Sequence, residues 1–155
     1  MSTQPTVAAS PWVIMKFGGT SVSSRESWET IARLTADRLK QGLRPVIVHS
    51  ALGGVSDALA EILDIAVSGD PSAALERIHR QHHELAEALE LDGDGLLAER
   101  LHELDQLVAG VRLVKEVSVR VRVRVMALGE LLSTSLGAAF LAQQGLPVRL
   151  LDARD

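Results

Sequence analysis

The chain has 155 residues, of which 46% are hydrophobic and 23% charged, and its formal net charge is -4. This length suffices for one domain with a hydrophobic core, and the composition is typical of a soluble globular protein. The acidic excess argues against a nucleic-acid-binding protein, which usually carries a basic surplus. The sequence contains no cysteine, which excludes disulfides, thiolate metal sites and a cysteine nucleophile and is compatible with a cytoplasmic location.

The N-terminal residues have neither a basic region nor a long apolar run, so they are unlike a secretory signal. We expect residues 1–11 to form a disordered lead and residues 12–155 to form one domain without an internal linker. Residues 131–148 carry no charge, but hydroxyls, glutamines and a proline interrupt them. A membrane span needs about 20 mostly apolar residues, so we expect a buried helix and then a strand, with no membrane contact.

The first predicted element is a strand at 13–17 ("VIMKF"), an apolar run with one lysine. A continuous apolar run is typical of a strand that is covered on both faces. After two glycines, Ser23 and Glu26 form a capping-box pattern that predicts the start of a helix. Gly42 stands where the cap at the end of this helix belongs.

A second apolar strand is predicted at 44–50, and the glycine-bearing turn "ALGGVSD" comes directly after it. The next helix has its apolar face within 59–66 and ends at Gly69. Asp70 and Pro71 are typical of a helix start. The remaining predicted elements are helices at 70–91 and 96–115 and a last strand at 147–151.

The segment "VSVRVRVRV" at 117–125 fits two structures. Its strict alternation is typical of an exposed strand, and a basic strand would suit nucleic acid. However, apolar residues from Val121 to Ala139 also fit one helical face, and no turn signal interrupts this stretch. We favour a helix at 120–144 that ends at Gly145, because the acidic net charge opposes the alternative.

Strands that alternate with helices predict an α/β fold with a parallel-rich sheet and helices on both faces. Ligands of such sheets bind beyond the carboxyl ends of the strands, where both glycine turns lie. Backbone amides of Gly18 and Gly19 are suited to bind an anion, and Lys16 adds a positive charge that suits phosphate. The alternative is a plain strand-to-helix turn with an exposed lysine.

The first turn does not match the common nucleotide motifs. Its lysine precedes the glycines, unlike a P-loop, and G-x-G-x-x-G is absent. The second turn has a similar pattern of a strand end, glycines and a helix start, with Ser50 at the strand end, Gly53 and Gly54 in the turn, and Ser56 near the next helix. Two such turns at neighbouring strand ends would enclose one anionic ligand from two sides.

Glu130 stands in a run without other charges, and an unpaired carboxylate is costly to bury. A substrate ammonium could be its cation, but the residues alone favour pairing with Arg120 or Arg124 or simple exposure to solvent.

A metal site is not predicted. His79, His82 and His83 lie within one helical turn but do not form an H-E-x-x-H motif, so we interpret them as part of a solvated helix face. The "DGDG" segment at 92–95 lacks the spaced ligands of a calcium loop and is interpreted as a turn.

Three segments, "KFGGTSV", "SALGGVSD" and "LGELLSTSLGAAFL", together resemble the aspartate kinases of the amino-acid kinase superfamily. The resemblance runs from residue 13 to the last residue. It implies a three-layer fold that is incomplete at the C-terminal side, so the chain is expected to be the N-terminal part of a catalytic domain. It also implies phosphorylation of the β-carboxylate of L-aspartate, the first step toward lysine, threonine and methionine.

The same resemblance implies ATP as the phosphoryl donor and Mg²⁺ that arrives with ATP. We also expect a homo-oligomer, because an incomplete sheet would expose an apolar edge where its next strand should pair. It assigns seven site residues: Lys16 as the catalytic residue that also binds ATP phosphates, Phe17, Gly18, Gly19 and Ser50 on the ATP side, and Ser56 and Glu130 on the aspartate side. In aspartate kinases a proline usually stands where this chain has Val119, which affects the expected start of the helix that bears Glu130.

We expect residues 1–155 alone to be inactive and to bind ATP weakly. Some aspartate kinases are fused to homoserine dehydrogenase or diaminopimelate decarboxylase, and this sequence does not distinguish these architectures. Two alternative functions remain open: a kinase for glutamate or acetylglutamate, and a non-catalytic regulatory domain of the same fold.

Overall fold

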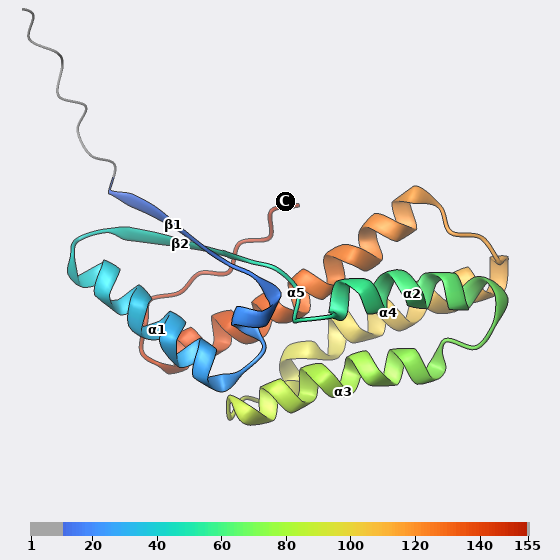
Figure 1. Cartoon of the computed structure of the whole chain (residues 1–155), viewed down its shortest axis with the longest axis horizontal. Coiled ribbons are helices and arrows are strands. Elements are labelled where there is room, and N and C mark those ends of the chain that lie inside the picture. Colours follow the sequence, from blue (N-terminus) through green and yellow to red (C-terminus); the bar gives the residue numbers. More distant parts are fainter. Residues whose placement is uncertain (1–10, 155) are drawn as a thin grey trace, which may run out of the picture.

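The computed structural model describes residues 11–154, so all but one residue of the predicted disordered lead lie outside the described part. The described chain forms two strands, one short 3₁₀ helix and five α-helices (Figure 1). In chain order these are β1 (Trp12–Phe17), η1 (Gly19–Val22), α1 (Arg25–Lys40), β2 (Arg44–His49), α2 (Val55–Ser68), α3 (Ser72–Ala88), α4 (Gly93–Val114) and α5 (Val119–Gln143).

The two strands pair in parallel, with Phe17 opposite His49 at their carboxyl ends. Helix α1 connects them and runs along one side of the sheet (Figure 1). Parallel pairing through a helical crossover confirms the predicted α/β arrangement. Burial alternates along both strands, so that Ile14 is 74% exposed while Phe17 and Ile47 pack against the core. Within residues 11–154 only one face of the sheet is covered, which corrects the expectation of a first strand buried on both faces.

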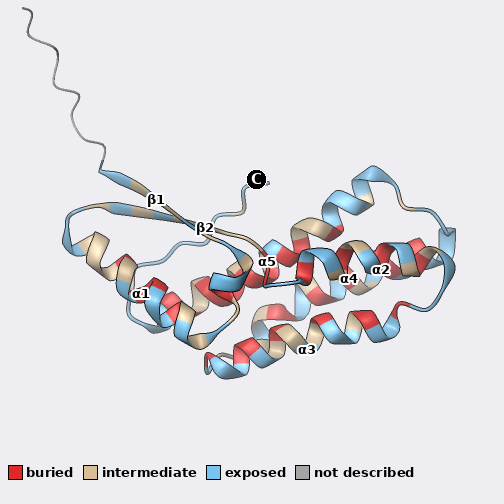
Figure 2. Cartoon of the chain, viewed as in Figure 1, coloured by how far each residue is buried: buried red, intermediate tan, exposed pale blue. Residues whose placement is uncertain are grey.

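Helix α5 lies at the centre of the helical part and contacts α1, α2, α3 and α4. Its buried residues continue into a shared core, as the burial colours show (Figure 2). Gly137 brings α5 close to α1, because a Cβ atom there would lie 2.1 Å from the Trp28 ring. By length and composition alone α5 could span a membrane, but 56% of its most apolar window is buried inside the protein.

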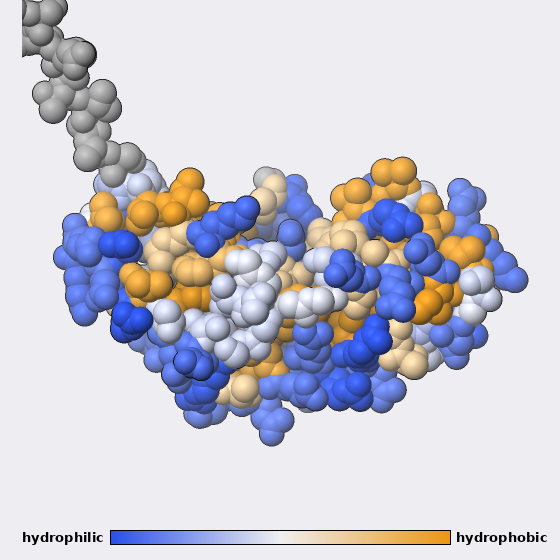
Figure 3. Space-filling view, viewed as in Figure 1, coloured by the Kyte–Doolittle hydropathy of each residue, from blue (hydrophilic) through white to orange (hydrophobic). Residues whose placement is uncertain are grey.

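The uncovered face of the sheet is largely apolar. Trp12 and Ile14 of β1 lie on it together with Val46 and Val48 of β2, and all four are exposed. The space-filling view shows a concentration of hydrophobic residues at this end of the molecule (Figure 3). Lys16 alternates with these residues along β1 and therefore shares their face.

The ambiguous segment at 117–125 is helical from Val119 onward, one residue before the predicted start, and the strand alternative is wrong. Ser118 caps α5 by accepting a hydrogen bond from the Val121 backbone N–H, at 3.2 Å. Two of its arginines pair with neighbouring helices: Arg122 with Asp64 of α2, and Arg124 with Glu103 of α4. The alternation of valine and arginine therefore reflects a partly exposed helix start.

Three predictions at the ends of elements need correction. The predicted last strand at 147–151 has no regular structure, because no strand of the described part pairs with it. The residue that caps α1 is Ser24, which accepts from the Ser27 N–H at 3.3 Å, and not Ser23. Helix α4 begins at Gly93 inside the predicted turn, because the Asp92 carboxylate caps it.

The prediction of a solvated histidine face is wrong for one member of the group. His82 is fully buried, and its Nδ1–H donates to the Ile78 carbonyl at 2.8 Å. Its Nε2 has no hydrogen-bond partner among the described residues. Burial lowers the pKa of His82, and the neighbouring His79 and His83 lower it further. The side chain is therefore held neutral as part of the core.

Candidate active site

The two glycine turns meet at the carboxyl ends of β1 and β2. The Ser50 N–H donates to the Phe17 carbonyl at 3.3 Å, which extends the pairing by one step beyond the strands. A Cβ atom on Gly19 would lie 2.8 Å from the Ala51 carbonyl oxygen and 3.2 Å from the Gly53 nitrogen. Since no side chain fits there without moving backbone, a glycine at position 19 allows the two turns to touch.

Ser23 joins the two turns. Its hydroxyl donates to the Gly19 carbonyl at 2.6 Å and accepts a hydrogen bond from the Gly53 N–H at 2.8 Å. The Gly53 carbonyl in turn accepts from Gln81 Nε2 of α3 at 3.0 Å. Gly53 is thus hydrogen-bonded through both its N–H and its carbonyl, and its N–H is not free for a ligand. Sequence reasoning assigned Ser23 to a helix cap, because the partner lies 30 residues further along the chain.

The predicted phosphate-side residues lie around the first turn. Lys16 is the penultimate residue of β1 and is exposed, so its charge carries no burial cost in this chain. Gly18 is also exposed, and a Cβ atom there would meet nothing within 4 Å. The exposed peptide at Gly18 and the charge of Lys16 therefore lie on accessible surface beside the turn.

The second turn leads directly into α2. Gly54 is its N-cap residue, with φ of +79° and no side chain to cap the first helical amides. Ser56 is exposed in the first turn of this helix. An uncapped helix start with a hydroxyl beside it favours a negatively charged group. The positions expected to bind phosphate and aspartate thus belong to adjacent turns that share the Ser23 bridge.

Helix α5 reaches the second turn at Gly129. A Cβ atom on this glycine would lie 3.1 Å from Ala51 Cβ and 3.2 Å from Val55 Cγ1. Glu130 is the next residue and is exposed, while Arg124, one of its alternative partners, pairs with Glu103 instead. The fold therefore brings the Glu130 position next to the second turn, although the roles of the seven predicted residues stay predictions.

His49 lies beneath this site and was missed by the sequence reasoning. Its ring packs edge-on against Trp28, with centroids 5.3 Å apart, and its Nδ1 lies 3.1 Å from Ser50 O and 3.3 Å from Ser133 Oγ. Burial lowers the pKa of His49, while its hydrogen bond to Ser50 and the charge of Glu130 oppose this shift. A polar residue at the end of an otherwise apolar strand was the available signal.

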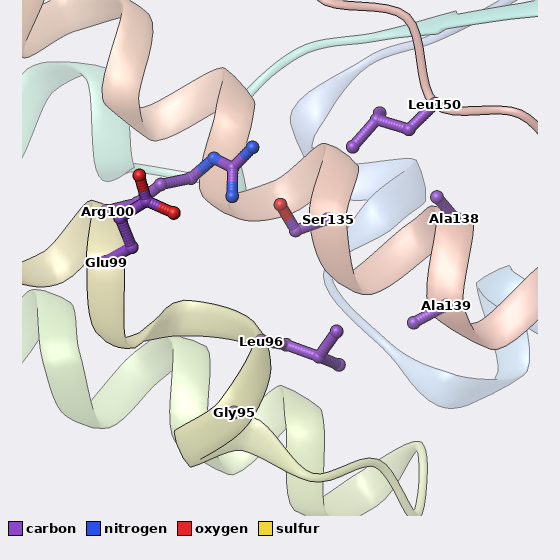
Figure 4. A pocket seen from close by; sticks show the side chains of 8 residues that line it. All are labelled: Gly95, Leu96, Glu99, Arg100, Ser135, Ala138, Ala139 and Leu150. Carbon is purple, nitrogen blue, oxygen red and sulfur yellow. The ribbon is translucent and has the colours of Figure 1, made fainter.

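Two hollows of the described surface lie away from the glycine turns. One of about 380 Å³ lies between α4 and α5 beside Leu150 (Figure 4). Its charged residues are Glu99 and Arg100, which project from α4 near the C-terminal segment, whereas Ala138 and Ala139 of α5 line the opposite wall. The glycine turns combine backbone amides, a lysine and a nearby carboxylate, so the chemistry places the candidate site there.

Comparison with known proteins assigns the chain to a family. The model of the amino acid kinase family matches residues 11–155, and the chain belongs to this family. Aspartokinase 1, chloroplastic, of Arabidopsis thaliana is 36% identical over 145 residues, which cover 90% of this chain and 25% of that protein. Aspartokinase 3, chloroplastic, of the same plant is 34% identical over the same shares. The resemblance to aspartate kinases is therefore confirmed, and the chain spans about a quarter of the length of these relatives.

The fold comparison agrees with the sequence comparison. A crystal structure of E. coli aspartokinase III in complex with aspartate and ADP matches with a TM-score of 0.77 and 23% sequence identity. The match covers 91% of this chain and 31% of that chain. It confirms the predicted α/β class as a part of an amino-acid kinase fold.

Proposed function

We propose that this chain contributes the N-terminal part of the catalytic domain of an aspartate kinase. In the proposed reaction a β-carboxylate oxygen of L-aspartate attacks the γ-phosphorus of ATP. An O–P bond forms to give aspartyl phosphate, the bond to the β-phosphate oxygen breaks, and ADP leaves. The supporting observation is the contact of the two glycine turns through Gly19 and Ser23, beside an exposed Lys16.

The proposed roles follow from the chemistry of phosphoryl transfer, which depends on positioning and on neutralising oxygen charge. Lys16 would stabilise negative charge on the transferring group, with the peptides at Phe17, Gly18, Gly19 and Ser50 along the phosphates. Ser56 and Glu130 would bind aspartate, Glu130 through the α-ammonium.

ATP fits the first turn because an exposed lysine and accessible backbone suit phosphate oxygens. Residues 11–154 contain no group of three or more His, Asp or Glu side chains placed to hold a metal ion. Mg²⁺ in nucleotide sites commonly keeps waters and phosphate ligands, so we propose that it arrives bound to ATP.

Substitution of Lys16 tests the proposal. In the protein at its natural length we expect Lys16→Ala to lower aspartate-dependent ATP turnover by about 10²–10³-fold, since one preorganised charge has this effect on a transition state. Lys40→Ala is the matched control, because Lys40 ends α1 on the exposed surface and pairs only locally with Asp37. Unchanged turnover in Lys16→Ala would reject a catalytic role and favour a non-catalytic domain.

The choice of substrate needs a separate measurement. We propose aspartate because Glu130 can pair with a free α-ammonium, which acetylglutamate lacks. The purified protein at its natural length should form hydroxamate from aspartate, ATP and hydroxylamine. In the same protein Glu130→Gln should raise the KM for aspartate more than the KM for ATP. Phosphorylation of glutamate but not of aspartate would replace this proposal.

We also propose that a polypeptide of residues 1–155 alone has no measurable kinase activity and binds MgATP weakly. The candidate site is an open surface, and few contacts must offset the loss of translational freedom on binding. Calorimetric titration with MgATP and a coupled assay would test this, and turnover near that of the natural-length protein would contradict it. A homo-oligomer and a cytoplasmic location complete the proposal, to be tested by ultracentrifugation and cell fractionation.

A further inference from the structure

The bridge between the two turns depends on one hydroxyl. Ser23 Oγ uses its proton to bond the Gly19 carbonyl and its lone pair to accept the Gly53 N–H, at 2.6 and 2.8 Å. Both partners are backbone atoms, so Ser23 fixes the relative position of two chain segments and not of a side chain. The strand pairing and the bond from the Ser50 N–H to the Phe17 carbonyl fix the strand ends, and Ser23 adds a hydrogen-bonded link between the turns beyond them.

The second turn would lose one of its two restraints at Gly53 without this bond. Gly53 and Gly54 are consecutive and exposed, and Gly54 already has a positive φ of +79°. Glycine pairs have wide conformational freedom, so a fixed turn needs bonds to its peptides. Ser23 bonds the Gly53 N–H and Gln81 bonds the Gly53 carbonyl, at 3.0 Å, so the peptide groups before and after the Gly53 Cα are each restrained.

We propose that Ser23 is a positioning residue that couples the nucleotide side of the site to its aspartate side. This inference rests on the proposed function. Nucleotide contacts at Gly18 and Gly19 would restrain the first turn. Because Ser23 bonds both turns, this would also restrain Gly53, which is followed by Gly54 and by the start of α2 with Ser56. Coupling between two binding sites is reciprocal, so each substrate raises the apparent affinity for the other.

The neighbouring serine offers a matched control. Ser24 caps α1 through the Ser27 N–H and is bonded only within that region, whereas Ser23 reaches the other turn. Ser24→Ala should therefore weaken the start of α1 and leave the link between the turns intact. Ser23→Thr keeps the hydroxyl and should restore whatever Ser23→Ala removes.

Hydrogen–deuterium exchange tests the bridge itself, in the protein at its natural length. We expect the Gly53 amide to exchange about 2- to 12-fold faster in Ser23→Ala, which is the range that one net hydrogen bond accounts for. Ser24→Ala and Ser23→Thr should exchange at the wild-type rate. An unchanged Gly53 rate in Ser23→Ala would overturn the bridge.

Kinetics then test the coupling. The KM for aspartate is measured at low and at saturating MgATP, and the ratio of the two values gives the coupling factor. We expect Ser23→Ala to lower this factor by about fivefold or more, within the usual range of such couplings, while kcat at saturation changes less. Ser24→Ala and Ser23→Thr should keep the wild-type factor.

The outcomes separate the two proposals. Wild-type protein that does not phosphorylate aspartate would overturn the proposed function, and the coupling with it. Active wild-type protein with an equal coupling factor in Ser23→Ala would overturn the coupling alone and leave the proposed function in place.

Discussion

Substitution of Gly137 by alanine should test how α5 packs against α1. A Cβ atom at this position would lie 2.1, 2.6 and 2.8 Å from three ring carbons of Trp28. Ordinary carbon contacts are about 3.5 Å or longer, so the ring edge must retreat by roughly 1.4 Å. Trp28 is fully buried and its Nε1–H donates to the Val22 carbonyl at 2.9 Å, so it has no free space to enter.

The expected cost is worked out from these contacts. Overpacking a core costs about 1–3 kcal/mol, and loss of the Trp28 hydrogen bond adds about 1 kcal/mol. The higher helix propensity of alanine offsets about 1 kcal/mol of this destabilisation. We expect Gly137→Ala to lower the free energy of unfolding by about 2 kcal/mol, which corresponds to about 4–8 °C in Tm for a domain of this size.

Gly110 provides the matched control. It lies within α4, and a Cβ atom there would meet nothing within 4 Å. Gly110→Ala should therefore show only the stabilisation from the higher helix propensity of alanine and raise Tm by about 2–4 °C. Thermal unfolding measured by circular dichroism compares the two variants. A Tm of Gly137→Ala that equals or exceeds that of Gly110→Ala would refute the argument from the Trp28 contact.

Two further predictions concern the turns and a buried histidine. Gly19→Ala should separate the two turns, because its Cβ meets backbone atoms, and lower the free energy of unfolding in urea by about 1–3 kcal/mol. Gly18→Ala is the control and should unfold like wild type, because its Cβ meets nothing within 4 Å. Equal unfolding midpoints of the two variants would contradict the close approach at Gly19. Burial lowers the pKa of His82, so below its ordinary value of 6.5 the unfolded chain binds a proton that the folded chain does not. Protonation of His82 should make stability fall as pH drops below about 6.5, by up to about 1.4 kcal/mol per pH unit. His82→Leu should therefore reduce the slope, while the contribution of His49 remains. Identical slopes in urea titrations at several pH values would show that His82 is not responsible.

Periodicity and turn residues were sufficient to predict the order of elements, because these signals are local. The apolar face that continues from Val121 through α5 predicted a helix despite the alternating arginines, and the structure agrees. The segment at 147–151 has the composition of a strand but no pairing partner in the described part, and a strand forms only through such pairing. Local patterns describe the composition of a segment and not its pairing partner, so they did not predict this outcome.

The candidate site was predictable where a residue type acts through its own chemistry, and not where its role depends on a distant partner. Lys16 and the glycines stand out in the sequence, and the structure places them at the meeting point of two turns. The pattern with Glu26 predicted Ser23 as the helix cap, but Ser24 caps α1 and Ser23 bonds Gly53, which lies 30 residues further along the chain. His82 likewise looked exposed among charged neighbours, but the packing of α3 buries it.

The position of Trp28 makes the first turn visible to fluorescence spectroscopy. The sequence has two tryptophans, of which Trp12 is 56% exposed and Trp28 is fully buried, so Trp12→Phe would leave one emitter in an apolar environment. The indole N–H of that emitter bonds the Val22 carbonyl at the end of η1, and its ring rests against His49. Emission intensity would then report movement of the first turn and protonation of His49 in the same sample, without an attached dye.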